Sequence, residues 1–366
     1  MGFKCGIVGL PNVGKSTLFN ALTESDKAEA ANYLFATIEP NIGRVSVPDK
    51  RLEILSNIEK SEKTIPTYID FVDIAGLVKG ASAGEGLGNK FLAHIREVDA
   101  VAHVVRCFED DNVAHVTPYI NPLDDIDAIE TELKLADLET LQNKLNSLEK
   151  KSKSGDEKIK EQINIVQKTQ NQLNKDEKIN DLELKEEEKN FFNSLNLITS
   201  KPMLYICNVD EKSVAKGNSF SNSVKEKADM ESNDVVLVSA AIESQIAELE
   251  NETDKFEMLM ELELKETTLN KVIYAGYNLL NLVTFFTCGP KETRAWTITK
   301  NATAPQAAGK IHTDFEKGFI RAEAITYEDF ANLKGEAACR EAGKLRLEGK
   351  DYVVKDGDVF HFLFNV

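Results

Sequence analysis

The chain has 366 residues, of which 29% are charged and 42% are apolar, a balance typical of folded proteins and not of disordered ones. Acidic residues outnumber basic ones by 61 to 44, and the net charge of −17 excludes a uniformly basic protein that coats nucleic acid, while a local basic patch stays compatible with RNA contact. At roughly 150 residues per domain, the length predicts two to three domains.

The N-terminal residues combine a strand, a glycine-rich loop and a helix. Residues 3–8 (FKCGIV) predict a short buried strand, and residues 18–22 (LFNAL) begin a helix. The loop between them, residues 9–17 (GLPNVGKST), matches the GxxxxGK[ST] pattern of a P-loop. Its glycines let backbone N–H groups face phosphate oxygens, Lys15 supplies a positive charge for the β- and γ-phosphates, and Ser16 offers a hydroxyl to Mg²⁺. This context predicts a nucleotide-binding α/β domain.

A second nucleotide motif lies further along the chain. Residues 69–76 (IDFVDIAG) predict a hydrophobic strand that ends in DxxG, which places Asp73 to hold a Mg²⁺ water and the Gly76 N–H to sense the γ-phosphate. Between the two motifs, residues 33–41 (YLFATIEPN) contain Thr37, which would ligate Mg²⁺ only when a γ-phosphate is present. This loop is therefore a candidate switch.

Residues 77–89 (LVKGASAGEGLGN) predict a second switch, because their glycines disfavour a stiff helix. Ras-type enzymes carry glutamine directly after DxxG to orient the attacking water, whereas this chain carries Leu77. We therefore expect slow intrinsic hydrolysis unless another group or a partner positions the water.

A polar stretch at residues 108–115 (FEDDNVAH) follows a predicted strand at residues 102–106, on the side of the sheet where phosphates bind. We hypothesise that His115 enters the site from this stretch to position or activate water. The alternative is a loop histidine with purely local contacts.

Residues 129–200 are rich in Lys, Glu, Asn, Gln and Leu and predict a helical arm inserted into the nucleotide domain. Two narrow apolar stripes recur at helical spacing, and a turn with an N-cap at residues 154–156 separates them. We expect an antiparallel coiled coil. Its role is open between a structural arm and a docking arm for a large partner. The stripes consist of Leu138, Leu141, Leu145 and Leu148, and of Ile159, Ile163, Val166, Gln170 and Leu173.

The segment at residues 203–211 (MLYICNVDE) predicts the base-reading strand. GTPases place NKxD at this point, where the aspartate binds guanine and the lysine packs along the base, but here Val209 replaces the lysine and Glu211 the aspartate. The guanine clamp is weakened, while Asn208 still offers an amide to a purine, so ATP is favoured over GTP. Residues 235–241 (VVLVSAA) resemble the last nucleotide loop, where Ser239 and Ala240 approach the base. Taken alone, that stretch is a strand and a turn.

The C-terminal residues predict a β-grasp domain. Residues 281–287 and 293–298 form paired strands around a Cys-Gly-Pro turn, residues 307–315 a helix, and residues 351–362 two strands joined by an Asp-Gly turn. A local basic cluster offers an RNA contact, with ordinary surface charge as the alternative. The cluster consists of Lys310, His312, Lys317 and Arg321.

These motifs, in this order, resemble the Obg-like ATPase family, the YchF proteins, over essentially the whole chain. GLPNVGKST, FATIEPN, DIAGLVKGAS and CNVDE carry the resemblance, and Leu34 departs from it because a proline is expected there. The resemblance implies a cytosolic P-loop ATPase, related to GTPases and weaker with GTP, that associates with the ribosome and with translation or stress control. It also implies that the C-terminal domain is a TGS domain.

By motif matching, the resemblance assigns site residues. Those for the triphosphate are Asn12, Val13, Gly14, Lys15, Ser16 and Thr17; those for Mg²⁺ are Ser16 and Thr37, with Asp73 acting through water; those for the base are Asn208, Val209, Glu211, Ser239 and Ala240. Asn12 matches an asparagine of K⁺-stimulated relatives, which suggests K⁺ assistance. Lys15, Gly76 and His115 are the catalytic candidates.

We expect three domains: a nucleotide domain at residues 1–128 and 201–282, the arm at 129–200, and the TGS domain at 283–366. No apolar run reaches the roughly 18 residues of a membrane span, and the five cysteines are scattered, so we expect a cytoplasmic protein without membrane contact. The predicted function is that of a Mg²⁺-dependent ATPase with slow turnover. We expect it to be a monomer that binds the large ribosomal subunit or the whole ribosome. The alternatives are a GTP-specific translation GTPase and a nucleotide-gated binding protein with incidental hydrolysis.

Overall fold

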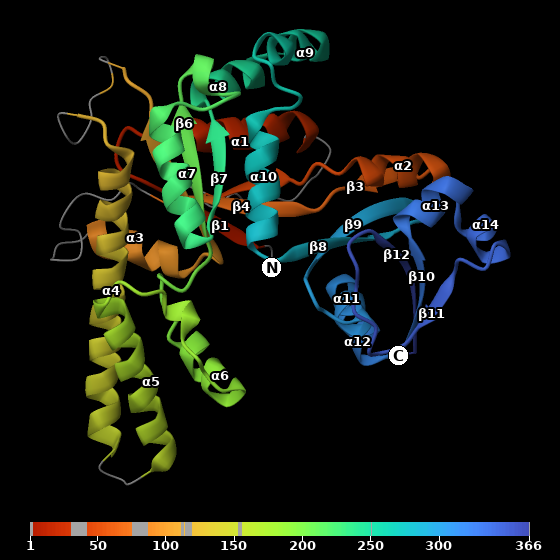
Figure 1. Ribbon diagram of the computed structural model, residues 1–366. Helices are drawn as coiled ribbons and strands as arrows, with labels where there is room; N and C mark the ends of the chain where they lie inside the picture. Colours follow the sequence, from red (N-terminus) through yellow and green to blue (C-terminus); the bar gives the residue numbers. More distant parts are fainter. Residues whose placement is uncertain are drawn as a thin grey trace. The chain divides into compact units, whose positions relative to one another are not determined.

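The computed structural model in Figure 1 describes residues 3–30, 42–74, 87–110, 113, 119–152, 156–249 and 251–365. Contacts between residues divide the chain into two compact units. We call Phe3–Gly43 with Phe71–Val272 the P-loop unit, and Arg44–Asp70 with Ile273–Val366 the C-terminal unit. Among the described residues, no helix is both long and apolar enough to cross a membrane.

A six-stranded sheet with the order β2-β4-β1-β5-β6-β7 forms the centre of the nucleotide fold. The pairs β1–β5, β5–β6 and β6–β7 are parallel, so their carboxyl ends meet at one edge. The strands are β1 (Lys4–Val8), β2 (Ile42–Ser46), β4 (Tyr68–Asp73), β5 (Ala100–Cys107), β6 (Met203–Val209) and β7 (Asp234–Val238). This confirms the predicted P-loop α/β fold. Strands β2 and β4 run across the boundary between the two units.

The strands β5 and β6 are buried along their length because helices cover the sheet. On one face, Val105 and Cys207 pack with Ile126 of α4 (Pro122–Ser152) and Val224 of α7 (Ser219–Glu231). Outside the arm, the described helices that lie in the P-loop unit or begin there are α1 (Lys15–Ala30), α3 (Leu87–Arg96), α7 (Ser219–Glu231), α8 (Ala240–Glu248), α9 (Glu252–Glu261) and α10 (Thr268–Leu279), with the 3-10 turn η3 (Glu211–Ser213).

The predicted arm is a helical hairpin of α4 (Pro122–Ser152) and α5 (Glu157–Asn174), which lie side by side in Figure 1. Its apolar seam buries Leu141 against the other helix, and Asp156 caps α5 by accepting a hydrogen bond from the Lys158 N–H. The structure adds two features: α4 begins before residue 129, and η2 (Ile179–Asp181) and α6 (Glu186–Ser194) close the same core with Phe192. A coiled-coil supertwist stays a prediction.

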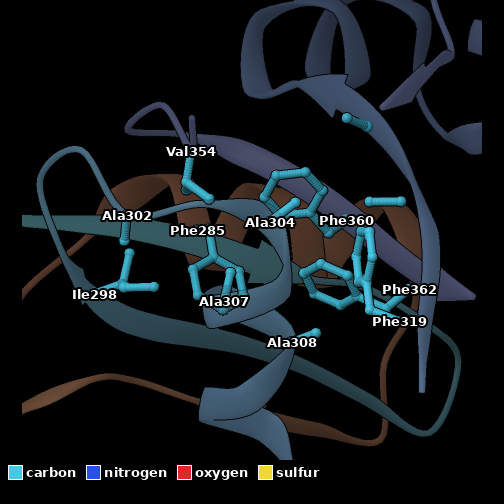
Figure 2. Packing of buried hydrophobic residues seen from close by; sticks show 12 residues of the cluster. Phe285, Ile298, Ala302, Ala304, Ala307, Ala308, Phe319, Val354, Phe360 and Phe362 are labelled. Carbon is cyan, nitrogen blue, oxygen red and sulfur yellow. The ribbon is translucent and has the colours of Figure 1, made fainter. Parts of the chain in front are cut away.

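The C-terminal unit contains a second six-stranded sheet with the order β11-β10-β12-β8-β9-β3. Figure 2 shows the core on one of its faces, where Phe285 and Phe360 pack against Ala304 and Ala307 of α11. The strands are β3 (Lys63–Ile65), β8 (Leu282–Thr287), β9 (Glu292–Thr299), β10 (Phe319–Thr326), β11 (Arg346–Glu348) and β12 (Asp358–Phe364). The helices are α2 (Lys50–Glu59), α11 (Ala304–Ile311), α12 (Thr313–Lys317), α13 (Tyr327–Leu333) and α14 (Glu336–Glu341).

The predicted β8–β9 hairpin is confirmed, but the strand predicted at residues 351–355 is wrong. That stretch is a turn with one isolated bridge between Thr303 and Val353, because the Asp358 carboxylate accepts from the Lys355 N–H at 2.9 Å and folds the chain back. Strand β12 pairs instead with β10 and β8. The predicted helix at 307–315 is two helices, since the backbone of His312 is extended.

Residues 44–70 fall inside the predicted nucleotide domain, yet they cluster with the C-terminal residues. Strand β3 pairs in parallel with β9, and α2 contributes Leu52 and Leu55 to the core around Phe286. The predicted three-domain boundaries remain a prediction, and the contacts of these residues do not follow them.

Candidate nucleotide-binding site

The P-loop connects β1 to α1 in a backbone conformation that requires glycine. Gly9 and Gly14 have φ values of 153° and 96°, and Asn12 is left-handed at 63°. A Cβ at Gly9 would lie 2.4 Å from the Val104 carbonyl oxygen, and one at Gly14 would lie 2.3 Å from the side-chain nitrogen of Asn208. The loop therefore turns its backbone tightly at the N-terminus of α1, where anions bind favourably.

Lys15 stabilises this loop through a hydrogen bond to its backbone. Its ammonium donates a 2.6 Å hydrogen bond to the Leu10 carbonyl, and the side chain is buried. Burial lowers the pKa of Lys15 to about 8, although the nearby Asp73 carboxylate acts to raise it. A bound phosphate would add negative charge next to this buried ammonium and so offset the cost of its burial.

Asp73 ends β4 beside Ser16 and Lys15, as the sequence predicts. Burial raises the pKa of the Asp73 carboxyl, while Lys15 and a hydrogen bond from Ser16 act to lower it. Its Oδ1 is buried and has no hydrogen-bond partner among the described residues. An unpaired carboxylate oxygen next to a serine hydroxyl fits the oxygen ligands that Mg²⁺ prefers.

Asn208, at the carboxyl end of β6, bridges two loops of the predicted site. Its Nδ2 donates to the Val13 carbonyl at 2.9 Å, and its Oδ1 accepts from the Ala240 N–H at 3.0 Å. Ser239 is buried directly before Ala240, at the start of α8. One side chain thus joins the P-loop to the last loop of the site.

The two altered positions of the base motif differ in their surroundings. Val209 is only 2% exposed and packs in the core with Val224, so its side chain is not accessible to a ligand. The Asp210 carboxylate is occupied because it caps η3 by accepting from the N–H groups of Lys212 and Ser213. Glu211 is exposed.

Sequence reasoning missed Arg106, the buried cation at the end of β5. It is 1% exposed and donates to the carbonyls of Phe108, Asp110 and Val113 at 3.2, 3.1 and 3.0 Å. The guanidinium also lies 4.7 Å from the centre of the Phe108 ring. A strand arginine followed by a polar loop was the available signal. Arg106 fixes the start of the loop that leads to residue 115.

The structure therefore brings Lys15, Ser16, Asp73, Asn208 and Ala240 to one edge of the sheet, with Asn12 and Thr17 exposed at the P-loop. Thr37, Gly76 and His115 lie outside the described residues, as do Leu34 and Leu77. The predicted basic cluster is exposed on α11, α12 and β10; its residues are Lys310, His312, Lys317 and Arg321.

Two protein families match parts of the chain. Residues 4–139 match a family described as 50S ribosome-binding GTPase. Residues 282–365 match the YchF-GTPase C-terminal family, described as a protein of unknown function.

Relatives match the whole chain. The ribosome-binding ATPase YchF of Escherichia coli O157:H7 is 57% identical over 366 residues, with 100% of both chains covered. The protein of the same name from Bacillus subtilis strain 168 is 51% identical over 368 residues, again with full coverage of both. A solved structure of the Schizosaccharomyces pombe YchF GTPase is 40% identical with a TM-score of 0.89, and the match covers 99% of this chain and 98% of that one.

Proposed function

The chain belongs to the YchF family, and from this premise we propose that it binds and hydrolyses ATP at the P-loop edge and associates with the ribosome. The observation that carries the catalytic part is the convergence of Lys15, Asp73 and Asn208 on one edge of the sheet. These groups supply a phosphate-binding charge, a metal-binding oxygen and a support for the base loop.

ATP is the preferred nucleotide in this proposal. A guanine clamp needs an aspartate at the position of Glu211, and the nearby Asp210 is engaged in capping η3. Asn208 and the loop at Ser239 and Ala240 accept a purine without demanding guanine. A competition titration of ATP against GTP tests this, and tighter GTP binding would favour a true GTPase.

Magnesium fits the oxygen groups present. Ser16 and Thr37 would hold the ion, with Asp73 acting through water, and the ion would neutralise charge on the β- and γ-phosphates. Asn12 is the residue proposed to bring K⁺ to the same phosphates. Titrating each cation against turnover separates these two roles.

His115 is the proposed water-positioning residue, supported by the loop that Arg106 holds at its start. Leu77 cannot hydrogen-bond to water, so basal turnover is slow. His115→Ala should lower turnover while leaving ATP affinity unchanged. Unchanged turnover would remove the histidine from the mechanism.

The ribosome contact runs through the arm or the C-terminal unit. The exposed basic cluster offers RNA a positive surface despite the acidity of the chain; its residues are Lys310, His312, Lys317 and Arg321. The protein acts in the cytoplasm as a monomer, bound to the large subunit or the whole ribosome.

Co-sedimentation with ribosomes, with turnover measured in the same tubes, tests the complete proposal. Nucleotide-dependent binding together with raised turnover supports an ATPase cycle on the ribosome. Binding that follows nucleotide occupancy while turnover stays flat favours a nucleotide-gated binding protein.

A further inference from the structure

Residues 44–70 connect the two loops that the sequence identifies as switches. The loop containing Thr37 precedes this segment in the chain, and Asp73 and Gly76 follow it. In the structure the segment is part of the C-terminal unit. In the sequence, the two predicted switch loops therefore flank a segment that packs with the C-terminal residues.

The helix of this segment is built into the C-terminal core. Leu52 and Leu55 of α2 are buried in a cluster with Phe286 of β8, Phe330 of α13 and Val359 of β12. Burial of two leucines among residues from three elements makes α2 an integral layer of this unit.

Backbone contacts extend the attachment along the segment. Strand β3 adds to the edge of the second sheet, where residue 63 pairs with 292 and residue 65 with 294. The Glu62 N–H donates to the Pro290 carbonyl at 2.9 Å, and the Ser61 hydroxyl donates to the Gly289 carbonyl at 2.8 Å. Thr67, directly before β4, hydrogen-bonds to Thr297.

Arg51 of α2 forms an ion pair that attaches residues 44–70 to the rest of the C-terminal unit. Its Nη1 lies 2.6 Å from Asp356 Oδ2, and its Nη2 lies 2.8 Å from Asp49 Oδ2. The Asp356 carboxylate also accepts from the Thr284 N–H at 2.9 Å, so it joins α2 to strand β8. A Cβ at Gly357 would lie 3.1 Å from Arg51 Nη1, which shows how closely this turn fits the guanidinium.

Strand β4 carries this attachment toward the catalytic edge. It starts at Tyr68, next to the Thr67 contact, and ends at Asp73. Arg44 of β2 binds Asp70 of β4 through two hydrogen bonds, Nε to Oδ1 at 2.8 Å and Nη2 to Oδ2 at 3.2 Å. Asp70 and Asp73 therefore lie on the same six-residue strand, and a regular strand is one of the rigid elements through which two positions can be coupled.

We propose that the Arg51–Asp356 pair, by holding the segment that leads into β4, positions Asp73 for hydrolysis, so that a partner bound to the C-terminal unit alters turnover. Arg51 and Asp356 are positioning residues that act through β4. The inference rests on the proposed hydrolysis of ATP and deepens it by assigning a regulatory input.

The test compares Arg51→Ala, Asp356→Asn, the double variant and Arg51→Lys. We expect kcat for ATP to fall about 2- to 30-fold in each single variant, while the Kd for ADP, which lacks the γ-phosphate, changes less than about twofold. The double variant should be no slower than the slower single one, and Arg51→Lys should recover part of the rate. Asp356→Asn keeps an oxygen for the Thr284 N–H and preserves folding.

Arg340→Ala is the matched control, because Arg340 also binds two carboxylates, those of Glu323 and Glu336, within the C-terminal residues. Its kcat should equal that of the wild type. Equal rates for Arg51→Ala, Asp356→Asn and Arg340→Ala would overturn the inference. So would a loss of ADP affinity that parallels the loss of kcat.

Amide hydrogen exchange tests the inference independently of turnover. A nonhydrolysable ATP analogue should slow amide exchange in α2 and β8 of the wild type, and this effect should be absent in Asp356→Asn. Unchanged exchange in the wild type overturns the inference. If the wild type does not hydrolyse ATP but shows the expected exchange effects, the result contradicts the proposed hydrolysis and leaves this inference standing.

Discussion

Asn208 and Val13 lie 195 residues apart in the chain, and a 2.9 Å hydrogen bond joins the side-chain amide of the first to the carbonyl of the second. The same side chain accepts from the Ala240 N–H. Strand β6 therefore fixes the distance between the P-loop and the loop at Ser239 and Ala240 through this one side chain.

Replacing Asn208 by alanine should weaken ATP and ADP binding together. The change leaves a buried carbonyl and a buried N–H without partners, and each such group costs about 1–3 kcal/mol. Calorimetric titration measures the affinities. Asn180→Ala is the control, because that amide donates to the exposed Ser200 carbonyl in the arm. Unchanged affinity in Asn208→Ala would contradict the bridging role.

Nucleotide affinity should fall as pH rises above about 8. Burial lowers the pKa of Lys15 to about 8, so the empty site loses this proton between pH 8 and 9. A bound triphosphate favours the charged ammonium and raises its pKa, so binding takes up a proton above pH 8. Titrations at pH 9 in buffers of different ionisation enthalpy measure this uptake. Heats that do not depend on the buffer would contradict the prediction.

Shortening Glu211 to aspartate should move the preference toward GTP. The side chain is exposed, so the free energy of unfolding should change by less than about 0.5 kcal/mol. A carboxylate one methylene shorter approaches the position that binds guanine, and we expect the ratio of ATP to GTP affinity to fall about tenfold. Glu226→Asp, an exposed change on α7, is the control and should leave the ratio unaltered.

Replacing Arg106 by methionine should lower both stability and turnover. Three carbonyls lose a shared charged donor, and we expect the free energy of unfolding to fall by roughly 3 kcal/mol in denaturant titrations. Lysine cannot serve all three carbonyls, so Arg106→Lys should recover little. At a temperature where the variant is folded, kcat should fall while the Kd for ADP stays unchanged. A normal kcat would show that the loop needs no such anchor.

Leu141→Ala should destabilise the arm and spare basal hydrolysis. Leu141 is completely buried in the arm core, and a cavity there costs about 2–5 kcal/mol. The core beside β5 and β6 is a separate cluster, so basal kcat should stay at the wild-type value. Leu135→Ala, on the same helix but 45% exposed, is the control for stability. Loss of basal turnover in Leu141→Ala would place the arm inside the catalytic cycle.

The sequence alone predicted those parts of the site whose geometry is local. Gly9, Gly14 and Lys15 follow one another closely enough that steric rules and phosphate chemistry identify their function. The apolar stripe around Leu141 likewise follows from helical periodicity. In each case the determining interactions lie within a few residues, so the pattern of residue types carries the information.

Only the tertiary structure decided the remaining relationships. Val209 reads as a base-contacting position in the motif, yet its side chain packs in the core. Arg106 anchors a loop by donating hydrogen bonds to its carbonyls, and the sequence of that loop has no periodic pattern that would predict these contacts. The three-residue strand β3 finds its partner β9 more than two hundred residues away, where neither strand length nor alternation specifies the pair. Local chemistry determined that the chain holds a nucleotide, whereas packing between distant segments determined that residues 44–70 belong to the C-terminal unit.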